Sequence, residues 1–293
     1  MDLEVLGLSA ALGSAASWAV GSILFKRLGE YLTPMAMTLA KGLVSLVLLA
    51  LALVATESPA VDQETLWLLI LSGVLGIALG DTFFFAALNH LGAHALVVLL
   101  TLGQVFTVGL AVIWLGERPT WSAYVGIVLI LTGVGLVLVD RMKDEAGNSS
   151  TTGILFGLLS VLCMSVSIII AKEALDQTSA IHATFVRMLA GTLGILLFGL
   201  ATRQLAGDLA PFADPRLALR FVLSVCVVTF GGFWLSLVAI QYADVAIAST
   251  LGSTEPLFVL PLAAYFLKER IGAQAVAGSI ATVAGIALLV IYS

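Results

Sequence analysis

Charged side chains inside apolar stretches are the first sign of chemistry in this sequence. Glu255 is the eleventh residue of an apolar stretch of 23 residues, positions 245–267. If that stretch crosses a bilayer, an ionised carboxylate near the midplane costs about 2.5 to 3.5 kcal/mol on insertion scales. The acid is therefore expected to be paired, protonated or exposed to a water-filled cavity. It is either a proton-coupling or cation site in a translocation path, or an acid held by a structural hydrogen bond at a kink.

Pro256, the next residue, predicts a break in that helix. Proline has no N–H, so the carbonyl of Gly252 loses its helical partner. A freed carbonyl beside the Glu255 carboxyl group makes a polar notch in an apolar helix.

Two basic residues occupy matching depths in two other apolar stretches. Lys41 and Arg187 each lie about eight residues into their stretch, or about 12 Å from its start at 1.5 Å per residue. Either residue binds a substrate carboxylate or phosphate, or pairs with Glu255 in one state; the alternative is a charge that anchors a helix end by extending toward the interface. Arg187 is the stronger candidate because a guanidinium grips a carboxylate with two hydrogen bonds.

Further polar and aromatic residues extend the candidate path. Asp81 follows Gly80 in a third apolar stretch and is expected either to face the cavity as a second coupling group or to cap a locally opened helix. The remaining predicted substrate contacts are amides and indoles, for which helix association and packing are the alternative roles: Asn89, Gln104, Gln241, Trp18 and Trp234.

Composition places the chain in a lipid bilayer. Hydrophobic residues make up 60% of it, charged residues 11%, and the mean hydropathy is +1.13, whereas a soluble domain has about one-quarter charged residues. The net charge of −5 lies mostly in loops, and no basic patch of the size that nucleic acid would require occurs, so we expect no nucleic acid as a partner. Cys163 and Cys226 have no metal-ligand spacing, so we expect no metal and no other cofactor.

The apolar stretches predict an all-α polytopic membrane protein with ten transmembrane helices, since runs of about twenty apolar residues follow one another with short polar breaks. Their expected ranges are 6–26, 34–55, 66–88, 93–115, 120–139, 153–172, 180–202, 217–242, 245–267 and 274–291.

The second half of the chain repeats the first. A shift of 152 positions places Glu117-Arg118 on Glu269-Arg270, and a shift of 146 places Lys41 on Arg187. This pattern indicates a duplicated unit: a first five-helix repeat at 1–139, a polar linker at 140–152 and a second repeat at 153–293. Five helices per unit is an odd number, so the second repeat is expected to lie inverted in the membrane, as in secondary transporters.

The motifs of the two repeats resemble those of the drug/metabolite transporter superfamily, EamA type. The second half carries the motif as STEPLF at 253–258 followed by LKER at 267–270. The first half has TLGQVF at 101–106 and LGER at 115–118, so Gly103-Gln104 replaces Glu-Pro, which makes Glu255 the single acid of the pair. The run GDTFFFAAL at 80–88 is typical of one branch of these proteins. The resemblance implies export or exchange of small metabolites across the inner membrane by alternating access, without a prosthetic group.

Three classes of function follow from these observations. The leading one is a secondary transporter of small metabolites such as amino acids, working as an exporter or proton-coupled exchanger; a broad drug or amine exporter is the alternative. A structural or receptor-like bundle leaves the buried charges unexplained. An enzyme is not expected, because no catalytic Ser/Lys, Ser/His or zinc-type spacing occurs. The small-molecule substrate and the bilayer are the expected partners, and the oligomeric state stays open.

The distribution of Lys and Arg predicts the orientation in the cell membrane. The loops on the linker side carry nine basic residues, whereas those on the side of the termini carry only Arg118 and Lys172. The positive-inside rule therefore places both termini outside the cytoplasm.

Overall fold

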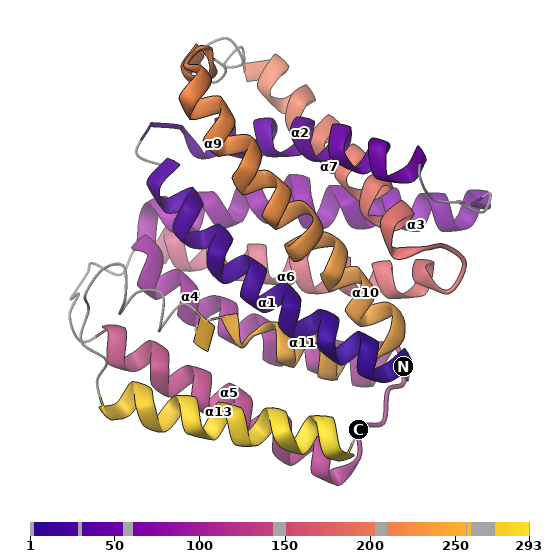
Figure 1. Ribbon diagram of the computed structural model, residues 1–293, viewed down its shortest axis with the longest axis vertical. Helices are drawn as coiled ribbons and strands as arrows, with labels where there is room; N and C mark the ends of the chain where they lie inside the picture. Colours follow the sequence, from indigo (N-terminus) through magenta and orange to yellow (C-terminus); the bar gives the residue numbers. More distant parts are fainter. Residues whose placement is uncertain are drawn as a thin grey trace.

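The structure, a computed structural model, describes residues 3–28, 31–54, 61–142, 151–202, 210–255, 257–258 and 273–292. Helices dominate these segments and no strand occurs in them (Figure 1). Six helical segments of this part are long and apolar enough to cross a membrane, and three shorter apolar helices accompany them. The chain is thus an all-helical membrane protein.

The described part of the first half forms five α-helices and one π-helical segment. Asp62 caps the third α-helix, since its side chain accepts a hydrogen bond from the N–H of Thr65 at 3.1 Å. Helix α2 begins at a proline, whose missing N–H costs nothing in the first turn. The elements are α1 (Leu3–Leu28), α2 (Pro34–Val54), α3 (Gln63–Gly73), η1 (Val74–Gly80, π-helical), α4 (Asp81–Trp114) and α5 (Trp121–Met142).

The second half follows the same order. Asp214 caps α9 by accepting a hydrogen bond from the N–H of Arg216 at 2.9 Å, and Pro215 occupies the first turn. The described elements are α6 (Thr151–Leu175), α7 (Ala180–Thr202), η2 (Ala210–Ala213, 3₁₀), α9 (Pro215–Cys226), η3 (Val227–Trp234, π-helical), α10 (Leu235–Tyr242), α11 (Val245–Gly252) and α13 (Ala273–Tyr292).

A π-helical segment interrupts the third long helix of each half. The Ser14 hydroxyl donates to the carbonyl of Gly232 in η3, and the Ser160 hydroxyl donates to the carbonyl of Gly80 in η1, both at 2.9 Å. A wider helical turn leaves carbonyls without their usual partner, and π-bulges are frequent at functional sites. A helix of the opposite half thus supplies the missing donor to each π-helical segment.

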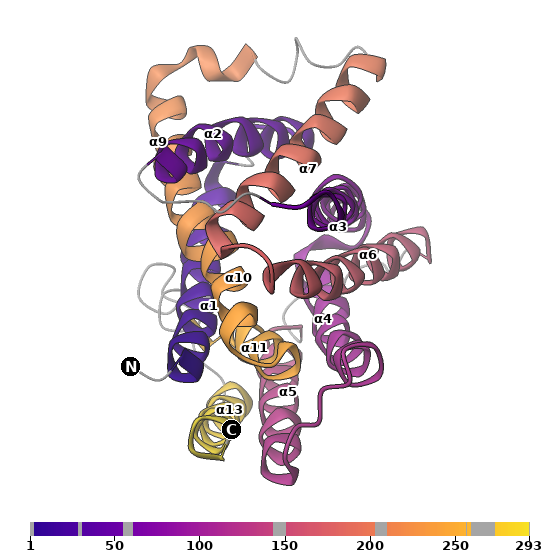
Figure 2. The ribbon, with the colours of Figure 1, turned by 90° about the vertical axis from the view of Figure 1, so that its right-hand side faces the viewer.

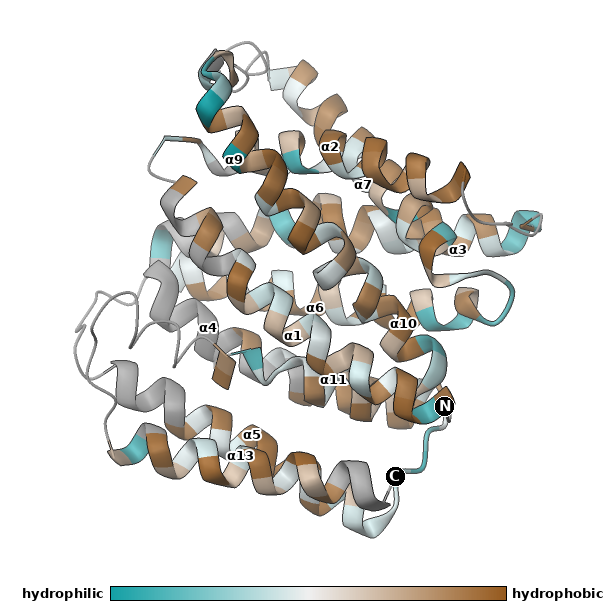
Figure 3. Ribbon diagram, viewed as in Figure 1, coloured by the Kyte–Doolittle hydropathy of each residue, from teal (hydrophilic) through white to brown (hydrophobic). Residues whose placement is uncertain are grey.

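Helices of the two halves pack against each other throughout the bundle. Helix α1 contacts α10 and η3, while α6 contacts α3 and η1; α2 lies against α7, and α4 against α11. The core contains many alanines, among them Ala15, Ala19 and Ala171 at 0% exposure, so the helices approach closely. Hydrophilic residues gather at helix ends such as the beginnings of α3 and α9 (Figure 3).

Helices α5 and α13 form an antiparallel pair at the edge of the molecule farthest from α2 and α7 (Figures 1 and 2). A Cβ at Gly133 would lie 2.5 Å from the carbonyl oxygen of Gly278, and one at Gly285 would lie 2.7 Å from that of Gly126. Only glycine permits this approach of the two backbones. The glycines that repeat between the two halves therefore meet in one interface.

The observed helix boundaries bear on two sequence-based expectations. The backbone is helical from Asp81 to Trp114, through the positions expected to separate the third and fourth spans, because no proline interrupts the helical hydrogen bonds there. In the predicted ninth span, α11 ends at Gly252 and Ser253 and Thr254 form a turn. Pro256 lies outside the described residues, as do positions 143–150 of the linker and 259–272.

Candidate functional site

A buried ion pair joins two of the charges that the sequence singled out. The Nζ atom of Lys41, on α2, lies 3.2 Å from Oδ2 of Asp81, the first residue of α4 after η1. The two side chains are only 10% and 13% exposed. Both charges are therefore largely removed from solvent, which is costly unless they stay paired.

An aromatic ring from the other half completes this environment. The Lys41 ammonium lies 4.9 Å from the ring centroid of Phe233, in η3, within the range of a cation–π interaction. The Trp18 indole meets the same ring edge-to-face at a centroid distance of 5.0 Å. We call Lys41, Asp81, Phe233 and Trp18 the central cluster; it draws on α1, α2, the η1–α4 junction and η3.

Sequence reasoning missed Phe233, although a signal for it existed. The shift of 152 positions that aligns the two halves places Asp81 on Phe233. Lys41 therefore contacts equivalent positions of both halves, a carboxylate in one and an aromatic ring in the other. The repeat explains why these positions meet, and their difference makes the site chemically asymmetric.

Arg187 is buried in a separate polar contact. Its Nη2 donates a 3.0 Å hydrogen bond to Oγ of Ser167, and its Nε has no hydrogen-bond partner among the described residues. Ser167 and Ser72 each donate from the hydroxyl to the other's carbonyl oxygen at 2.7 Å, tying α6 to α3. The guanidinium thus lies against α3, η1 and α6 and retains unused donor capacity.

Glu255 directly follows the turn that ends α11. The hydroxyls of Ser253 and Thr254 donate to the carbonyls of Thr250 and Leu251 at 2.6 and 2.7 Å. The N–H of Leu257 donates to the Thr254 carbonyl at 2.9 Å. Glu255 is partly buried and therefore lies at a true discontinuity of the helix.

A cavity of about 560 Å³ lies between α1, α7 and α10. Trp234 and Gln241, two of the predicted substrate contacts, line it together with Leu6, Ser9, Ala10, Ser179, Ala180, Ile181, Leu235, Val238 and Tyr242. The Gln241 amide accepts from the N–H of Ala180 and donates to the carbonyl of Thr178, both at 3.2 Å. Gln241 therefore links α10 to the start of α7. Trp234, on the same cavity wall, directly follows Phe233 of the central cluster in the sequence.

The side chains of Asn89 and Gln104 lie outside the described part of the structure, although both backbone positions belong to α4. Their predicted role in the path therefore stays a prediction. The described residues include no group of three His, Cys, Asp or Glu side chains that would hold a metal ion.

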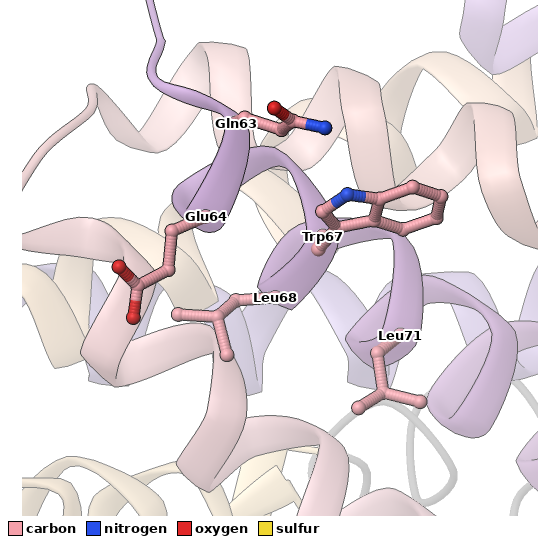
Figure 4. A pocket seen from close by; sticks show the side chains of 5 residues that line it. All are labelled: Gln63, Glu64, Trp67, Leu68 and Leu71. Atoms are coloured by element: carbon pink, nitrogen blue, oxygen red, sulfur yellow. The ribbon is translucent and has the colours of Figure 1, made fainter.

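A second hollow, of about 510 Å³, lies on the outer side of α3 and differs in kind (Figure 4). Residues of this single helix line it: Gln63, Glu64, Trp67, Leu68 and Leu71. Trp67 is 61% exposed and lies near the helix start, the usual place of an interfacial aromatic anchor. This hollow therefore belongs to the membrane-facing surface and not to the central cluster.

Comparison with known proteins agrees with this architecture. The model of the EamA-like transporter family matches residues 5–139 and again residues 151–291. An uncharacterized transporter of Archaeoglobus fulgidus is 25% identical over 99% of this chain and 98% of its own length. Protein LicB of Haemophilus influenzae is 26% identical over 70% of this chain and 72% of its own.

A solved crystal structure of another protein has the same fold. It superposes with a TM-score of 0.78 at 16% sequence identity, covering 99% of this chain and 97% of that one. Together with the two matches of the family model along the chain, these findings identify the protein as a member of the EamA-like transporter family.

Proposed function

We propose that the protein is a secondary active transporter that moves small zwitterionic solutes, such as amino acids, across the cell membrane by alternating access. We propose that it exports these solutes or exchanges them against protons. The observation that carries this proposal is the Lys41–Asp81 ion pair, buried against Phe233 in the interior of the bundle.

Charge balance at the central cluster explains why a zwitterion fits. Removing one partner of a buried ion pair leaves an uncompensated charge and costs about 3 to 5 kcal/mol. A solute that carries only an ammonium group would take Asp81 and strand Lys41, and a solute that carries only a carboxylate would strand Asp81. A zwitterion pairs with both residues, so it separates them without leaving a buried charge alone.

The aromatic side chains would add selectivity for the ammonium end. An ammonium that replaces Lys41 beside Asp81 would lie over the face of Phe233, where a desolvated cation gains about 2 kcal/mol. The Trp18 indole supports that ring from its edge. Arg187, with its unused Nε donor, is the second candidate contact for a carboxylate.

Proton coupling is assigned to Asp81 and Glu255. Protonation of Asp81 would remove the charge that holds Lys41 and so release it toward a substrate carboxylate. Glu255 occupies the helix break after α11, where a carboxyl group can exchange protons more readily than inside an intact apolar helix.

An arrangement of ten helices in two inverted repeats is part of the proposal. The equivalent π-helical segments, the matched hydrogen bonds from Ser14 and Ser160, and the family model that matches each half support it. In such transporters the substrate lies near the membrane midplane between the repeats, as the central cluster does between helices of both halves.

A drug or amine exporter is the second candidate, and one observation favours it. The protein's own ammonium already lies over an aromatic ring, the arrangement that recognises organic cations. In that case Lys41 would have to leave the cluster when the cation binds.

Ligand-induced thermal stabilisation of the purified protein separates these candidates. The library contains amino acids, the amines that lack their carboxylate and the acids that lack their ammonium group. A ligand at 100 times its Kd should stabilise the wild type by about 2.7 kcal/mol. We expect amino acids to bind at least about 100-fold more tightly than either matched analogue.

Variants of the charged residues check the role assigned to each charge. Lys41→Met is expected to favour amines and Asp81→Asn to favour carboxylic acids, because each leaves the opposite charge without its partner. Glu173→Gln, at an exposed carboxylate that accepts from the Trp114 indole, is the matched control. If only amines stabilise the wild type and Glu255→Gln abolishes that effect, the protein is an amine exporter instead.

A further inference from the structure

The amino end of α11 is held by a residue of the other half. Glu117, in the α4–α5 loop, accepts hydrogen bonds from the N–H groups of Val245 and Ala246 at 2.6 and 2.9 Å, one on each carboxylate oxygen. Asp244, at the N-cap position itself, makes no capping hydrogen bond. A carboxylate suits this place because the first N–H groups of a helix lack partners and carry partial positive charge.

The loop before Glu117 is shaped to present it. Gly116 has a φ of +69°, a conformation that glycine adopts without strain. The N–H of Glu117 donates back to the carbonyl of Ala111 at 3.3 Å, which closes the end of α4. The carboxylate is thereby turned from the end of α4 toward the start of α11.

Side chains of its own half also hold the α10–α11 turn by hydrogen bonds. Lys172, near the end of α6, donates from Nζ to the carbonyls of Ile240 and Ala243 at 2.6 and 3.4 Å. Gln241 ties the same turn to the start of α7. Hydrogen bonds therefore tie the turn to α6 and α7, and Glu117 adds hydrogen bonds from the first half, whose helix α1 also packs against the turn.

This attachment lies on the face where the chain begins and ends. Gly7 of α1 packs against the backbone of Tyr242 and Ala243, and the α4–α5 loop lies at the same end of the bundle as the two termini (Figure 1). A second link between the halves lies close by, since the Trp114 indole donates to Glu173 at 3.1 Å. The two halves are thus tied together at the termini face by side chains that are partly or fully exposed.

We propose that Glu117 is a gate residue whose bonds to α11 hold the termini face closed and must break before that face opens. This inference rests on the alternating access of the proposed function. We call the contact of Glu117 with Val245 and Ala246 the Glu117 clasp. It is strong because its bonds are charge-assisted, and it can be released because Glu117 is only half-buried, so that water can replace the lost bonds.

Spin-label distance measurements on the full-length protein in nanodiscs test the clasp without a substrate. Cys163 and Cys226 are replaced by alanine, and labels are placed at Arg118→Cys and Asp244→Cys, two exposed positions on opposite sides of the clasp. A second label pair at Gln177→Cys and Asp244→Cys lies within the second half and is the control for local loosening. The variants are Glu117→Ala and, as the control carboxylate, Glu4→Ala, an exposed acid in the first turn of α1 on the same face.

We expect a short inter-half distance to dominate in the wild type and a longer one to grow at least about threefold in Glu117→Ala. The shift corresponds to a change of about 0.65 kcal/mol in the closed–open equilibrium by RT ln 3. Glu4→Ala should leave the distribution unchanged, and the distance within the second half should stay single in every variant.

Two results would overturn the proposal. One is a Glu117→Ala distribution that superposes on the wild type; the other is equal broadening of the distance within the second half, which would make Glu117 a static helix cap. The transport proposal is decided separately, by uptake of radiolabelled L-amino acids into proteoliposomes. Its failure would leave the spectroscopic result on the opening of this face intact.

Discussion

Lys41 and Asp81 show how much a buried charge depends on its partner. They are 40 positions apart in sequence and meet through the packing of α2 beside the η1–α4 junction. The sequence identified both residues as unusual because charges are rare in apolar stretches. It did not reveal their pairing, because the π-helical segment shifts the direction in which Asp81 points, and apolar periodicity does not predict such a segment.

A double-mutant cycle measures this pairing as a free energy. We expect Lys41→Met and Asp81→Asn each to lower the free energy of unfolding by about 3 to 5 kcal/mol, because each leaves a buried charge uncompensated. The double variant should be clearly more stable than the sum of the two losses predicts. Thermal unfolding in detergent provides the measurement, with Glu173→Gln as the control. Simple additivity of the two single effects would mean that water already solvates both groups.

Phe233 and Gln241 show the opposite limits of sequence reasoning at the residue scale. Phe233 was open to prediction, since the repeat places it on Asp81, but an aromatic residue in an apolar helix carries no signal of its own. Gln241 carried a polar signal, yet its amide bonds to the backbone at Thr178 and Ala180. The presence of a glutamine in an apolar helix does not by itself distinguish a side chain that binds a ligand from one that links two helices.

At the scale of elements, helix ends and helix irregularities position the chemistry. The predicted break in the ninth span coincides with the end of α11 at Gly252, where a proline follows within four residues. The π-helical segments were not predicted, since the sequences of η1 and η3 are as apolar as any helix around them. Their hydrogen bonds come from Ser14 and Ser160, which the shift of 146 positions places on each other without indicating their partners.

The pH dependence of stability tests how the Glu117 carboxyl group caps α11. Burial raises the pKa of its carboxyl group above the ordinary value of 4.5, against the lowering effect of the N–H groups of Ala246 and Val245. Asp244 raises this pKa further and Lys172 lowers it. Because the pKa is raised in the folded protein, the resulting stabilisation is fully present below the ordinary pKa and is lost as pH rises through the raised value.

We therefore expect the melting temperature of the wild type, relative to Glu117→Gln, to fall as the pH increases through that window. Paired melting curves from about pH 4 to about pH 8 would measure this difference. Asp244→Asn should reduce the effect, because it removes a neighbouring negative charge. A difference that rises with pH instead would show that the two backbone N–H groups outweigh the cost of burial.

The whole molecule has two distinct ends, and their charges differ. The beginning of α1, the end of α13 and the α4–α5 loop lie together at one end, whereas α5 ends and α6 begins at the other (Figure 1). The helical bundle and its class could be predicted from composition and periodicity. The two ends could be told apart from the sequence only by counting crossings, and the backbone stays helical from Asp81 to Trp114 without a break that marks where the third crossing ends and the fourth begins.

Orientation in the membrane decides which compartment the Glu117 clasp faces. The basic residues gather in loops at the end away from the termini, and Lys and Arg concentrate on the cytoplasmic side of membrane proteins.

We therefore expect alkaline phosphatase fused after Ser293 to be active and green fluorescent protein at the same place to stay dark. Fusions after Met142, the last residue of α5, are the matched control and should give the reverse pattern. A fluorescent fusion after Ser293 would show the opposite membrane orientation, in which the Glu117 clasp faces the cytoplasm. With the expected result, the clasp faces the outside, and its release would open the central cluster to the compartment into which an exporter delivers its substrate.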